Sequence, residues 1–169
     1  MTPLVSIIMG STSDLPVMEE AAKVLNELQI HFEMNALSAH RTPNKVEVFA
    51  KTAVKRGIKV IIAGAGMAAH LPGVVAAMTP LPVIGVPIKA SLDGLDSLLA
   101  IVQMPPGIPV ATVAINGARN AGILAAQILA TGDPQLMSKM IQFKEELKEK
   151  IIKANEDLGK VKFEYKVDI

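Results

Sequence analysis

Three short segments of the chain combine the residue types that chemistry on a small anionic ligand needs. They read GSTSD at 10–14, SAHRTP at 38–43 and GAGMAAHLPG at 64–73. Hydroxyl and free backbone N–H groups at the start of a helix bind phosphate or other anions. An arginine contacts phosphate or carboxylate through two hydrogen bonds, and an imidazole exchanges protons near neutral pH. Together these residue types predict a site that binds an anion and moves a proton.

The first segment predicts an anion site at the beginning of a helix. Ser11 and Ser13 supply hydroxyl groups, and the carboxylate of Asp14 is suited to accept hydrogen bonds from the hydroxyl groups of a sugar. Ordinary capping of the helix by Ser13 or Asp14 explains the same residues without a ligand. Taken alone, this segment leaves both interpretations open.

The second segment places a histidine and an arginine side by side, just before a helix that begins at Pro43. Arg41 is a candidate for bidentate contact with phosphate or carboxylate. Ser38 and His40 are candidates for the same site. The alternative is a surface arginine without a role, and a second anion-type segment at the same sheet edge favours binding.

The third segment follows a short apolar run and leads into an apolar helix. Gly64 and Gly66 let the backbone turn sharply and approach a ligand closely. His70 is the candidate general acid–base, and Leu71 at the start of the helix is a further candidate for binding. The alternative is a tight turn with a solvated or buried histidine, and the presence of His40 at the same edge weighs against it.

A metal site and a dinucleotide site are both poorly supported by the residues. The histidines of the two segments lack cysteine partners and a fixed carboxylate spacing, and no G-x-S-x-G motif is present. Residues 64–69 fit the loose dinucleotide pattern G-x-G-x-x-A. That pattern follows the third predicted strand instead of the first, and the next strand ends at Ile88 and Lys89 instead of an acidic residue. The remaining histidine, His31, begins a predicted strand and is given a structural role.

Five apolar runs of strand length alternate with helical patterns. The predicted strands are 4–9, 31–37, 59–63, 82–87 and 109–114. The predicted helices are 15–28, 43–56, 71–78, 95–102 and 118–130, with Thr42 as an N-cap and Gly57 as a helix end. This alternation predicts an α/β fold, a flavodoxin-like, three-layer, doubly wound parallel sheet. Ligands bind at the carboxyl ends of the strands in such sheets, where all three segments begin.

The length of 169 residues fits a single catalytic domain, with a core at 4–131 and a C-terminal helix and tail at 132–169. The helix is expected from Pro134 to about Leu158, with an apolar stripe that must be buried on the domain's own sheet or on a neighbouring subunit. Residues 160–169 alternate in hydropathy up to Ile169. They predict a strand or extended arm, with a disordered tail as the alternative.

Composition narrows the classes of function. The mean hydropathy of +0.39 is high for a soluble domain and suggests surface buried against partner subunits. No run of residues is long enough for a membrane span, and no signal peptide is evident. The absence of cysteine fits a cytoplasmic protein. A net charge of +1 and five aromatic residues speak against nucleic-acid binding.

The three segments, in this order, resemble the class I N5-carboxyaminoimidazole ribonucleotide mutase family of purine biosynthesis. SAHRTP and GAG-x-AAHLPG in one chain are far more specific than any G-x-G-x-x-G match. Further matches occur at 82–87, 94–99, 101–105 and 120–129. The likeness covers about residues 4–131, and 132–169 carry no motif of the family.

The resemblance implies an isomerase that moves a carboxylate from the exocyclic nitrogen to the ring carbon of an aminoimidazole ribonucleotide. It implies a flavodoxin-like subunit of a homo-octamer without metal or cofactor. Ser11 and Arg41 then correspond to phosphate contacts and Asp14 to the acceptor from the ribose diol. Ser38 and His40 correspond to positions near the migrating carboxylate. His70 corresponds to the proton shuttle, protonating the carbamate nitrogen and later removing the ring proton.

The chain departs from the family pattern at Met67, where another glycine is usual, and in the shorter segments at 89–92 and 116–119. Met67 is expected to narrow the mouth of the pocket. Three other functions remain open. They are a direct carboxylase that uses CO2, a non-catalytic phosphate- or nucleotide-binding module on the same fold, and a Rossmann-type oxidoreductase.

Overall fold

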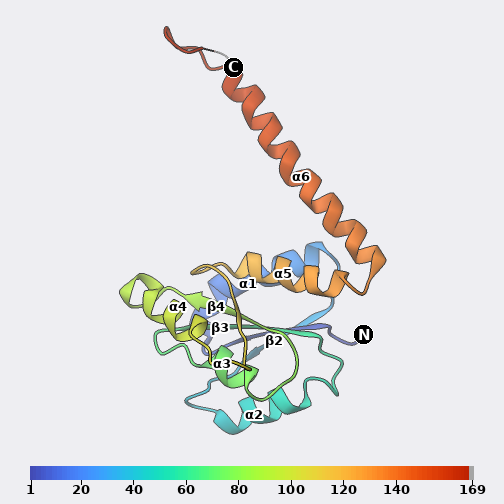
Figure 1. The fold of residues 1–169 in the computed structure, drawn as a ribbon, viewed down its shortest axis with the longest axis vertical. Helices are drawn as coiled ribbons and strands as arrows, with labels where there is room; N and C mark the ends of the chain where they lie inside the picture. Colours follow the sequence, from blue (N-terminus) through green and yellow to red (C-terminus); the bar gives the residue numbers. More distant parts are fainter. Residues whose placement is uncertain (168–169) are drawn as a thin grey trace.

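The computed structural model, which describes residues 1–167, contains a parallel sheet with helices on both faces (Figure 1). Its strands are β1 (Val5–Met9), β2 (Phe32–Ala36), β3 (Val60–Gly66), β4 (Val83–Ile88) and β5 (Ala111–Thr112). They are ordered β2-β1-β3-β4-β5, and every neighbouring pair is parallel. The chain therefore winds outward in both directions from β1 and β3, which confirms the predicted flavodoxin-like α/β fold.

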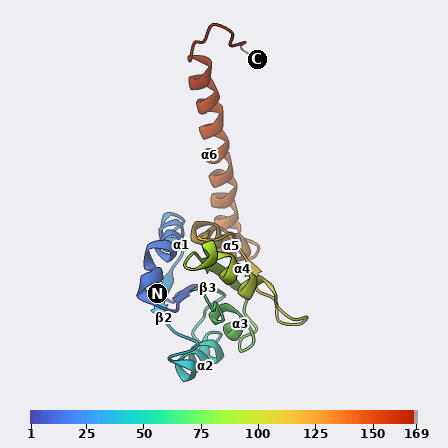
Figure 2. The same ribbon diagram turned by 90° about the vertical axis from the view of Figure 1, so that its left-hand side faces the viewer.

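The helices complete three layers. They are η1 (Thr12–Asp14), α1 (Leu15–Glu27), α2 (Pro43–Thr52), α3 (Leu71–Ala76), η2 (Leu92–Gly94), α4 (Leu95–Val102), α5 (Ala118–Ala130) and α6 (Pro134–Gly159). Helices α1 and α5 cover one face of the sheet, and α2, α3 and α4 cover the other (Figures 1 and 2).

The core lies on both faces of the central strands. In β1, Ile7 packs in the cluster with α1 and α5, and its neighbour Ile8 packs in the cluster with α2 and α3. Ile61 and Ile62 of β3 divide in the same way, and all four side chains are fully buried. Full burial of such a side chain contributes about 1.5–3 kcal/mol. Burial on two faces explains why these strands are continuous apolar runs without alternation.

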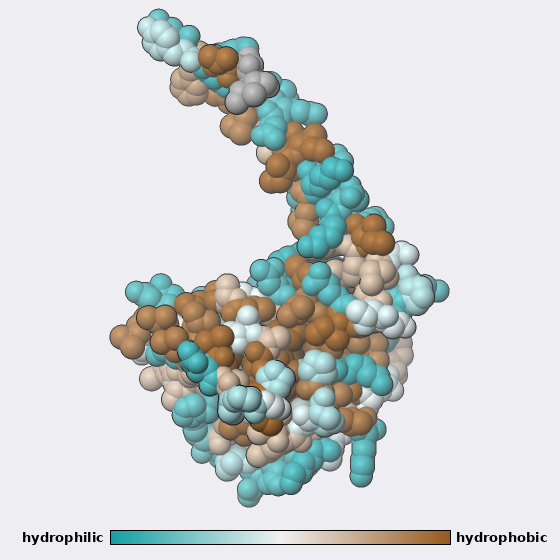
Figure 3. All heavy atoms as spheres, viewed as in Figure 1, coloured by the Kyte–Doolittle hydropathy of each residue, from teal (hydrophilic) through white to brown (hydrophobic). Residues whose placement is uncertain are grey.

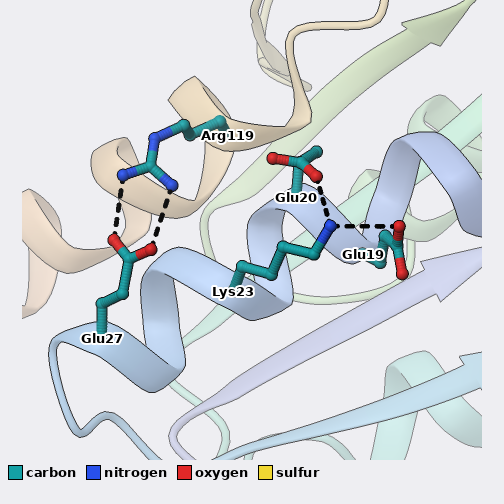
Figure 4. A network of polar contacts seen from close by, with 5 residues as sticks. All are labelled: Glu19, Glu20, Lys23, Glu27 and Arg119. Carbon is teal, nitrogen blue, oxygen red and sulfur yellow. Dashed lines mark hydrogen bonds and ion pairs between the residues drawn. The ribbon is translucent and has the colours of Figure 1, made fainter.

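Close packing and ion pairs join α5 to α1. Gly122 lies so near Ala21 and Val24 that a Cβ there would overlap the Val24 side chain. At the surface, the Arg119 guanidinium donates to both carboxylate oxygens of Glu27, at 2.9 and 3.4 Å (Figure 4). Lys23 pairs with Glu19 and Glu20 one helical turn away on α1 (Figure 4). The exposed pairs contribute little, so the small residues of the contact hold these helices together.

Two strands, β3 and β5, differ from the sequence prediction by more than one residue at an end. Strand β3 continues through Gly66, because residues 64–66 pair in register with residues 86–88 of β4. The predicted loop at 64–70 therefore begins three residues later. Strand β5 pairs with β4 at only two positions, although 109–114 was the predicted range. It is an edge strand that follows Pro109, which has no N–H to donate.

Among the helix boundaries, the end of α2 differs most from the prediction. Helix α2 ends at Thr52 instead of Arg56 and is followed by turns up to Gly57, whose φ of 86° suits glycine. Thr42 occupies the N-cap position without making a capping hydrogen bond from its side chain. Ser11, not Ser13 or Asp14, provides the side-chain cap in the first loop, where its Oγ accepts from the N–H of Ser13.

Helix α6 begins against the body and then leaves it. The carboxylate of Asp133 accepts hydrogen bonds from the N–H groups of Gln135 and Leu136 and caps the helix. Only Leu136 and Met140 of α6 are buried, and the helix then projects away from the body (Figures 1 and 2). Residues 160–167 contain a turn and no strand, and Ile169 of the predicted arm lies outside the described residues. Within residues 1–167, no helix is both long and apolar enough to cross a bilayer.

Candidate functional site

A cavity of about 560 Å³ lies at the carboxyl edge of the sheet. It is bounded by the segments that follow β1, β2, β3 and β4. The neighbouring strands β1 and β3 mark the point where the order of the strands reverses, since β2 lies beyond β1 and β4 lies beyond β3. This is the usual ligand position in a doubly wound sheet. Its lining residues are Gly10, Ser11, Ser13, Asp14, Ser38, Ala39, His40, Arg41, Ala65, Gly66, Met67, Ala68, Leu71 and Ala90.

The segment after β1 turns directly into η1. The Oγ of Ser11 accepts from the backbone N–H of Ser13 at 3.3 Å, and the Oγ of Ser13 donates to the carboxylate of Asp14 at the same distance. A Cβ added at Gly10 would meet nothing within 4 Å, so this backbone faces open space. The segment therefore presents hydroxyl groups and a carboxylate to the cavity from a short rigid turn.

The carboxyl group of Asp14 is partly buried where it lines the cavity. Partial burial raises the pKa of the Asp14 carboxyl above its usual range. The hydrogen bonds from Ser13 and the Ser11 backbone, and the positive charge of Arg41, act in the opposite direction but are smaller. The carboxylate thus lacks full compensation for the loss of water, and hydroxyl donors from a ligand would supply it.

The segment after β2 is closed by Thr42. Its Oγ1 accepts from the N–H of Ser38 at 3.0 Å and lies 3.1 Å from the Ser38 carbonyl oxygen, to which it can donate. The backbone N–H of Thr42 donates to the same carbonyl at 2.8 Å. These contacts explain why the Thr42 side chain does not cap α2. They fix a loop from which the side chains of Ser38, His40 and Arg41 reach the cavity.

Arg41 links two segments of the site. Its guanidinium donates to the carbonyl oxygen of Gly10 at 2.8 Å, and its Nε donates to the Oγ of Ser38 at 3.3 Å. The Ser38 hydroxyl also accepts from the backbone N–H of Arg41 at 3.1 Å. No carboxylate pairs with this guanidinium among the described residues. Its positive charge is therefore held in place and left available to an anion.

The two histidines of the site contact each other directly. His40 Nε2 and His70 Nδ1 lie 2.8 Å apart, which is a hydrogen bond in which one ring nitrogen donates and the other accepts. Their ring planes are inclined at 83°, with the ring centres 5.0 Å apart. One nitrogen of each ring is used in this bond, so each keeps one nitrogen for another partner. Residues 30 positions apart in the sequence thus form a single unit.

The other predicted residues divide between cavity and core. Gly66 and Leu71 line the cavity, whereas Gly64 does not. A Cβ on Gly64 would overlap the sulfur of Met18. Glycine at this position therefore allows α1 to pack closely against the sheet. His70 is also outside the lining and reaches the site through His40. His31 is exposed and distant in the fold from the carboxyl edge, at the start of β2.

Four alanines and Gly10 complete the lining and were not predicted as binding residues. Ala39, Ala65 and Ala68 neighbour predicted residues in the sequence, but Ala90 follows β4. Their side chains carry no polar group, so residue type gave no signal. The order of the strands in the sheet gives a signal for Ala90, because β4 lies next to β3 and the carboxyl end of β4 must lie at the same edge of the sheet. Within residues 1–167, no three His, Asp or Glu side chains gather as they do around a bound metal ion.

Known proteins similar to this chain include N5-carboxyaminoimidazole ribonucleotide mutases and phosphoribosylaminoimidazole carboxylases. Over 147 residues, the chain is 62% identical to the N5-carboxyaminoimidazole ribonucleotide mutase of Pyrococcus abyssi, covering 86% of this chain and 84% of that protein. It is 58% identical to the mutase of Thermotoga maritima over 160 residues, covering 94% of each. It is also 58% identical to the phosphoribosylaminoimidazole carboxylase of Schizosaccharomyces pombe over 161 residues. That match covers 95% of this chain but only 29% of the yeast protein.

Solved structures agree with the fold. PurE of Treponema denticola superposes with a TM-score of 0.83 at 31% sequence identity, covering 92% of this chain and 98% of that one. The model of the AIR carboxylase family matches residues 4–150. The sequence motifs indicated a likeness that ends near residue 131, so the family match extends farther, into α6. With most of its length matched in this way, and with full-length relatives above half identity, the chain belongs to the AIR carboxylase family.

Proposed function

We propose that the chain is an N5-carboxyaminoimidazole ribonucleotide mutase, an isomerase of purine biosynthesis. It would convert the carbamate of the exocyclic nitrogen into the carboxylate of the ring carbon. The observation that carries the proposal is the hydrogen-bonded pair of His40 and His70 beside a cavity that also holds an available arginine. Relatives of similar length that are named as this mutase support it.

Arg41 and the segment after β1 would hold the ribose phosphate. The guanidinium is fixed by Gly10 and Ser38, so binding would cost little further ordering of that side chain. Ser11 and Ser13 would donate hydroxyl hydrogens to the phosphate. Asp14 would accept from the ribose hydroxyl groups, which compensates the burial that raises its pKa.

The histidine pair would carry the proton. His40 lines the cavity and His70 does not, so we assign the contact with the substrate to His40, whereas the sequence favoured His70. If His40 Nε2 donates to His70 Nδ1, then His40 Nδ1 is the nitrogen that exchanges a proton, and His70 keeps the tautomer fixed. His70 is then a positioning residue with respect to the substrate.

The reaction would follow in two steps that balance. His40 as imidazolium protonates the carbamate nitrogen, the N–C bond breaks, and CO2 leaves with the amine neutral. The ring carbon then attacks CO2, and the now neutral imidazole removes the ring proton. Ser38, Gly66 and Leu71 line the space in which CO2 must remain between the steps. Exclusion of water and fixed geometry would favour its recapture.

The lengths of the relatives favour the mutase over a direct carboxylase. Proteins named as the mutase match this chain over most of their length, whereas the chain spans 29% of the carboxylase from Schizosaccharomyces pombe. The test is product formation without added metal from two substrates in parallel. One is the N-carboxylated ribonucleotide, and the other is the uncarboxylated ribonucleotide with bicarbonate. We expect rapid conversion of the first and a need for high bicarbonate with the second.

The other outcomes of this assay separate the alternatives. Efficient use of only the uncarboxylated ribonucleotide would make the chain a direct carboxylase. Activity with neither, combined with tight binding of the ribonucleotide, would leave a phosphate- or nucleotide-binding module. Binding of a nicotinamide dinucleotide would restore the oxidoreductase hypothesis.

We also propose a homo-oligomer located in the cytoplasm, and an octamer as the resemblance implies. Helix α6 supports assembly, because Ile141, Ile151 and Leu158 are exposed along it in the isolated chain. Apolar side chains gather along the projecting helix between polar ones (Figure 3). A helix of this kind gains most of its stability from packing, so a second copy is the natural cover. Light scattering on the purified protein would give the number of subunits.

A further inference from the structure

Met67 combines an unfavourable backbone conformation with a position at the mouth of the cavity. Its φ is 54°, in the left-handed region that a bulky side chain rarely adopts. Its side chain lines the cavity and is 59% exposed. A strained residue at a binding site often reflects a functional requirement.

The surrounding turn fixes the strain at Met67. Strand β3 ends at Gly66, where a Cβ would lie 3.2 Å from the carbonyl oxygen of Ile88. The Met67 carbonyl then accepts from the N–H of Ala69 at 2.9 Å, and α3 begins at Leu71. The chain must reverse within these residues, and glycine would meet that requirement at the lowest conformational cost. The turn therefore accounts for the φ value but not for a long side chain.

Met67 is also unusual among the lining residues. The other apolar side chains there are alanines and Leu71, and Leu71 is only 3% exposed because it belongs to the core. Among the lining residues, Met67 is thus the long apolar side chain that is largely exposed, at the mouth of an otherwise small-residue and polar cavity. Its three rotatable bonds and polarizable thioether let it fit over ligands of irregular shape.

We propose that the side chain of Met67 covers the mouth of the cavity and retains CO2 between the two steps of the reaction. This inference rests on the proposed mutase function. CO2 is small, uncharged and apolar, so the arginine and the hydroxyl groups that hold the ribonucleotide give it little hold. A mobile apolar side chain over the mouth slows its escape and admits less water. Met67 makes no bond to a reacting atom and acts on the fate of the intermediate.

The experiment measures escape directly. The N-carboxylated ribonucleotide carries an isotopic label in its carboxyl group, and the buffer contains unlabelled bicarbonate. Mass spectrometry gives the labelled fraction of the C-carboxylated product and the amount of uncarboxylated ribonucleotide per turnover, after subtraction of an enzyme-free blank. The variants are Met67→Gly, Met67→Ala and Met67→Leu, with Met78→Ala, in the turn just after α3 and outside the cavity lining, as a matched control.

We expect wild type, Met67→Leu and Met78→Ala to retain the label to a similar extent. Met67→Gly and Met67→Ala should lose it several-fold more often, with the amine product rising in proportion. Met67→Gly relieves the left-handed strain, so its thermal unfolding serves to show that leakage is not caused by a damaged fold. Equal retention of label by all variants would overturn the role of Met67. Failure of wild type to form any carboxylated product would overturn the mutase function instead.

Discussion

The body of the molecule buries its large apolar side chains, whereas the outer part of α6 leaves them exposed. In the body, Ile7 and Ile8 of β1 are fully buried on two faces of one sheet. On α6, Phe143 still packs against the core, but farther along the helix the apolar side chains are exposed, and Ile151 is 64% exposed (Figures 1 and 3). The first region completes its core within one chain, and the second does not.

Under the proposed assembly, this difference separates the chemistry from the contact between subunits. All the residues that line the cavity come from the body, between Gly10 and Ala90. Helix α6 contributes none of them, and its apolar surface fits contact with another copy. Substitutions in the cavity should therefore change turnover without changing the oligomer, and substitutions on α6 should do the reverse. Each prediction below tests that separation, beginning with the largest expected effect.

Replacement of the histidine at the cavity should have the largest effect. We expect His40→Asn to lower kcat by ~100-fold or more, the usual consequence of losing a general acid–base, with the oligomer unchanged. His70→Asn should lower kcat by less, because it acts through His40, and the double variant should be no slower than His40→Asn. Steady-state kinetics and light scattering provide both measurements, with His31→Asn as the control. A larger loss of kcat for His70→Asn than for His40→Asn would show that His70 is the proton shuttle.

Removal of the guanidinium should act on binding. A hydrogen bond to a charged group is worth about 1.5–3 kcal/mol, so Arg41→Ala should raise KM by roughly 10- to 100-fold. Its kcat should change much less if the interaction is equal in the ground and transition states. Lys45→Ala, an exposed cation on α2 outside the cavity lining, is the control. An unchanged KM for Arg41→Ala would exclude the phosphate role.

Polar substitution on α6 should weaken assembly and leave the active site intact. Burial of one large apolar side chain is worth about 1.5–3 kcal/mol, so Ile151→Ser should raise the dissociation constant of the subunit contact by roughly 10- to 100-fold. Light scattering over a concentration series measures the change. Lys153→Ser, on a different face of the same helix, should have no such effect. Loss of turnover in fully assembled Ile151→Ser would show that the two regions are not separate.

Neutralisation of Asp14 should produce the smallest effect, on stability. The pKa of this carboxyl is raised in the folded state, so the folded protein binds more protons than the unfolded one at pH values from the unfolded pKa of 3.8 up to the folded pKa. Its contribution to stability therefore falls as pH rises through that window. At pH 7, Asp14→Asn should be more stable than wild type by less than about 1 kcal/mol, because the group is only partly buried.

The measurement is thermal unfolding of wild type and Asp14→Asn at several pH values. The difference should shrink at pH values below 3.8, where the carboxyl is protonated in both states. The same variant should bind ribonucleotide more weakly, since a carboxamide is a poorer acceptor than a carboxylate. A variant that is less stable than wild type at pH 7 would show that the Arg41 and Ser13 contacts outweigh burial.

Residue types and their spacing determined most of the architecture. Continuous apolar runs of strand length, such as the one from Val5 to Met9, are typical of strands buried on both faces, and their alternation with helices indicates a parallel sheet. The rule that ligands bind at the carboxyl ends then places the segments 10–14, 38–43 and 64–73 at one edge. For that reason most of the predicted binding residues line the cavity that the structure contains.

Only the tertiary structure decided what individual side chains do there. Gly64 looks like a loop glycine in the sequence, yet it faces Met18 because β3 continues to Gly66 in register with β4. The histidine pair depends on the approach of two loops that sequence spacing does not encode, and so does the place of His40 at the cavity. Local patterns report the periodicity of burial, whereas a contact between distant segments depends on how the whole chain packs.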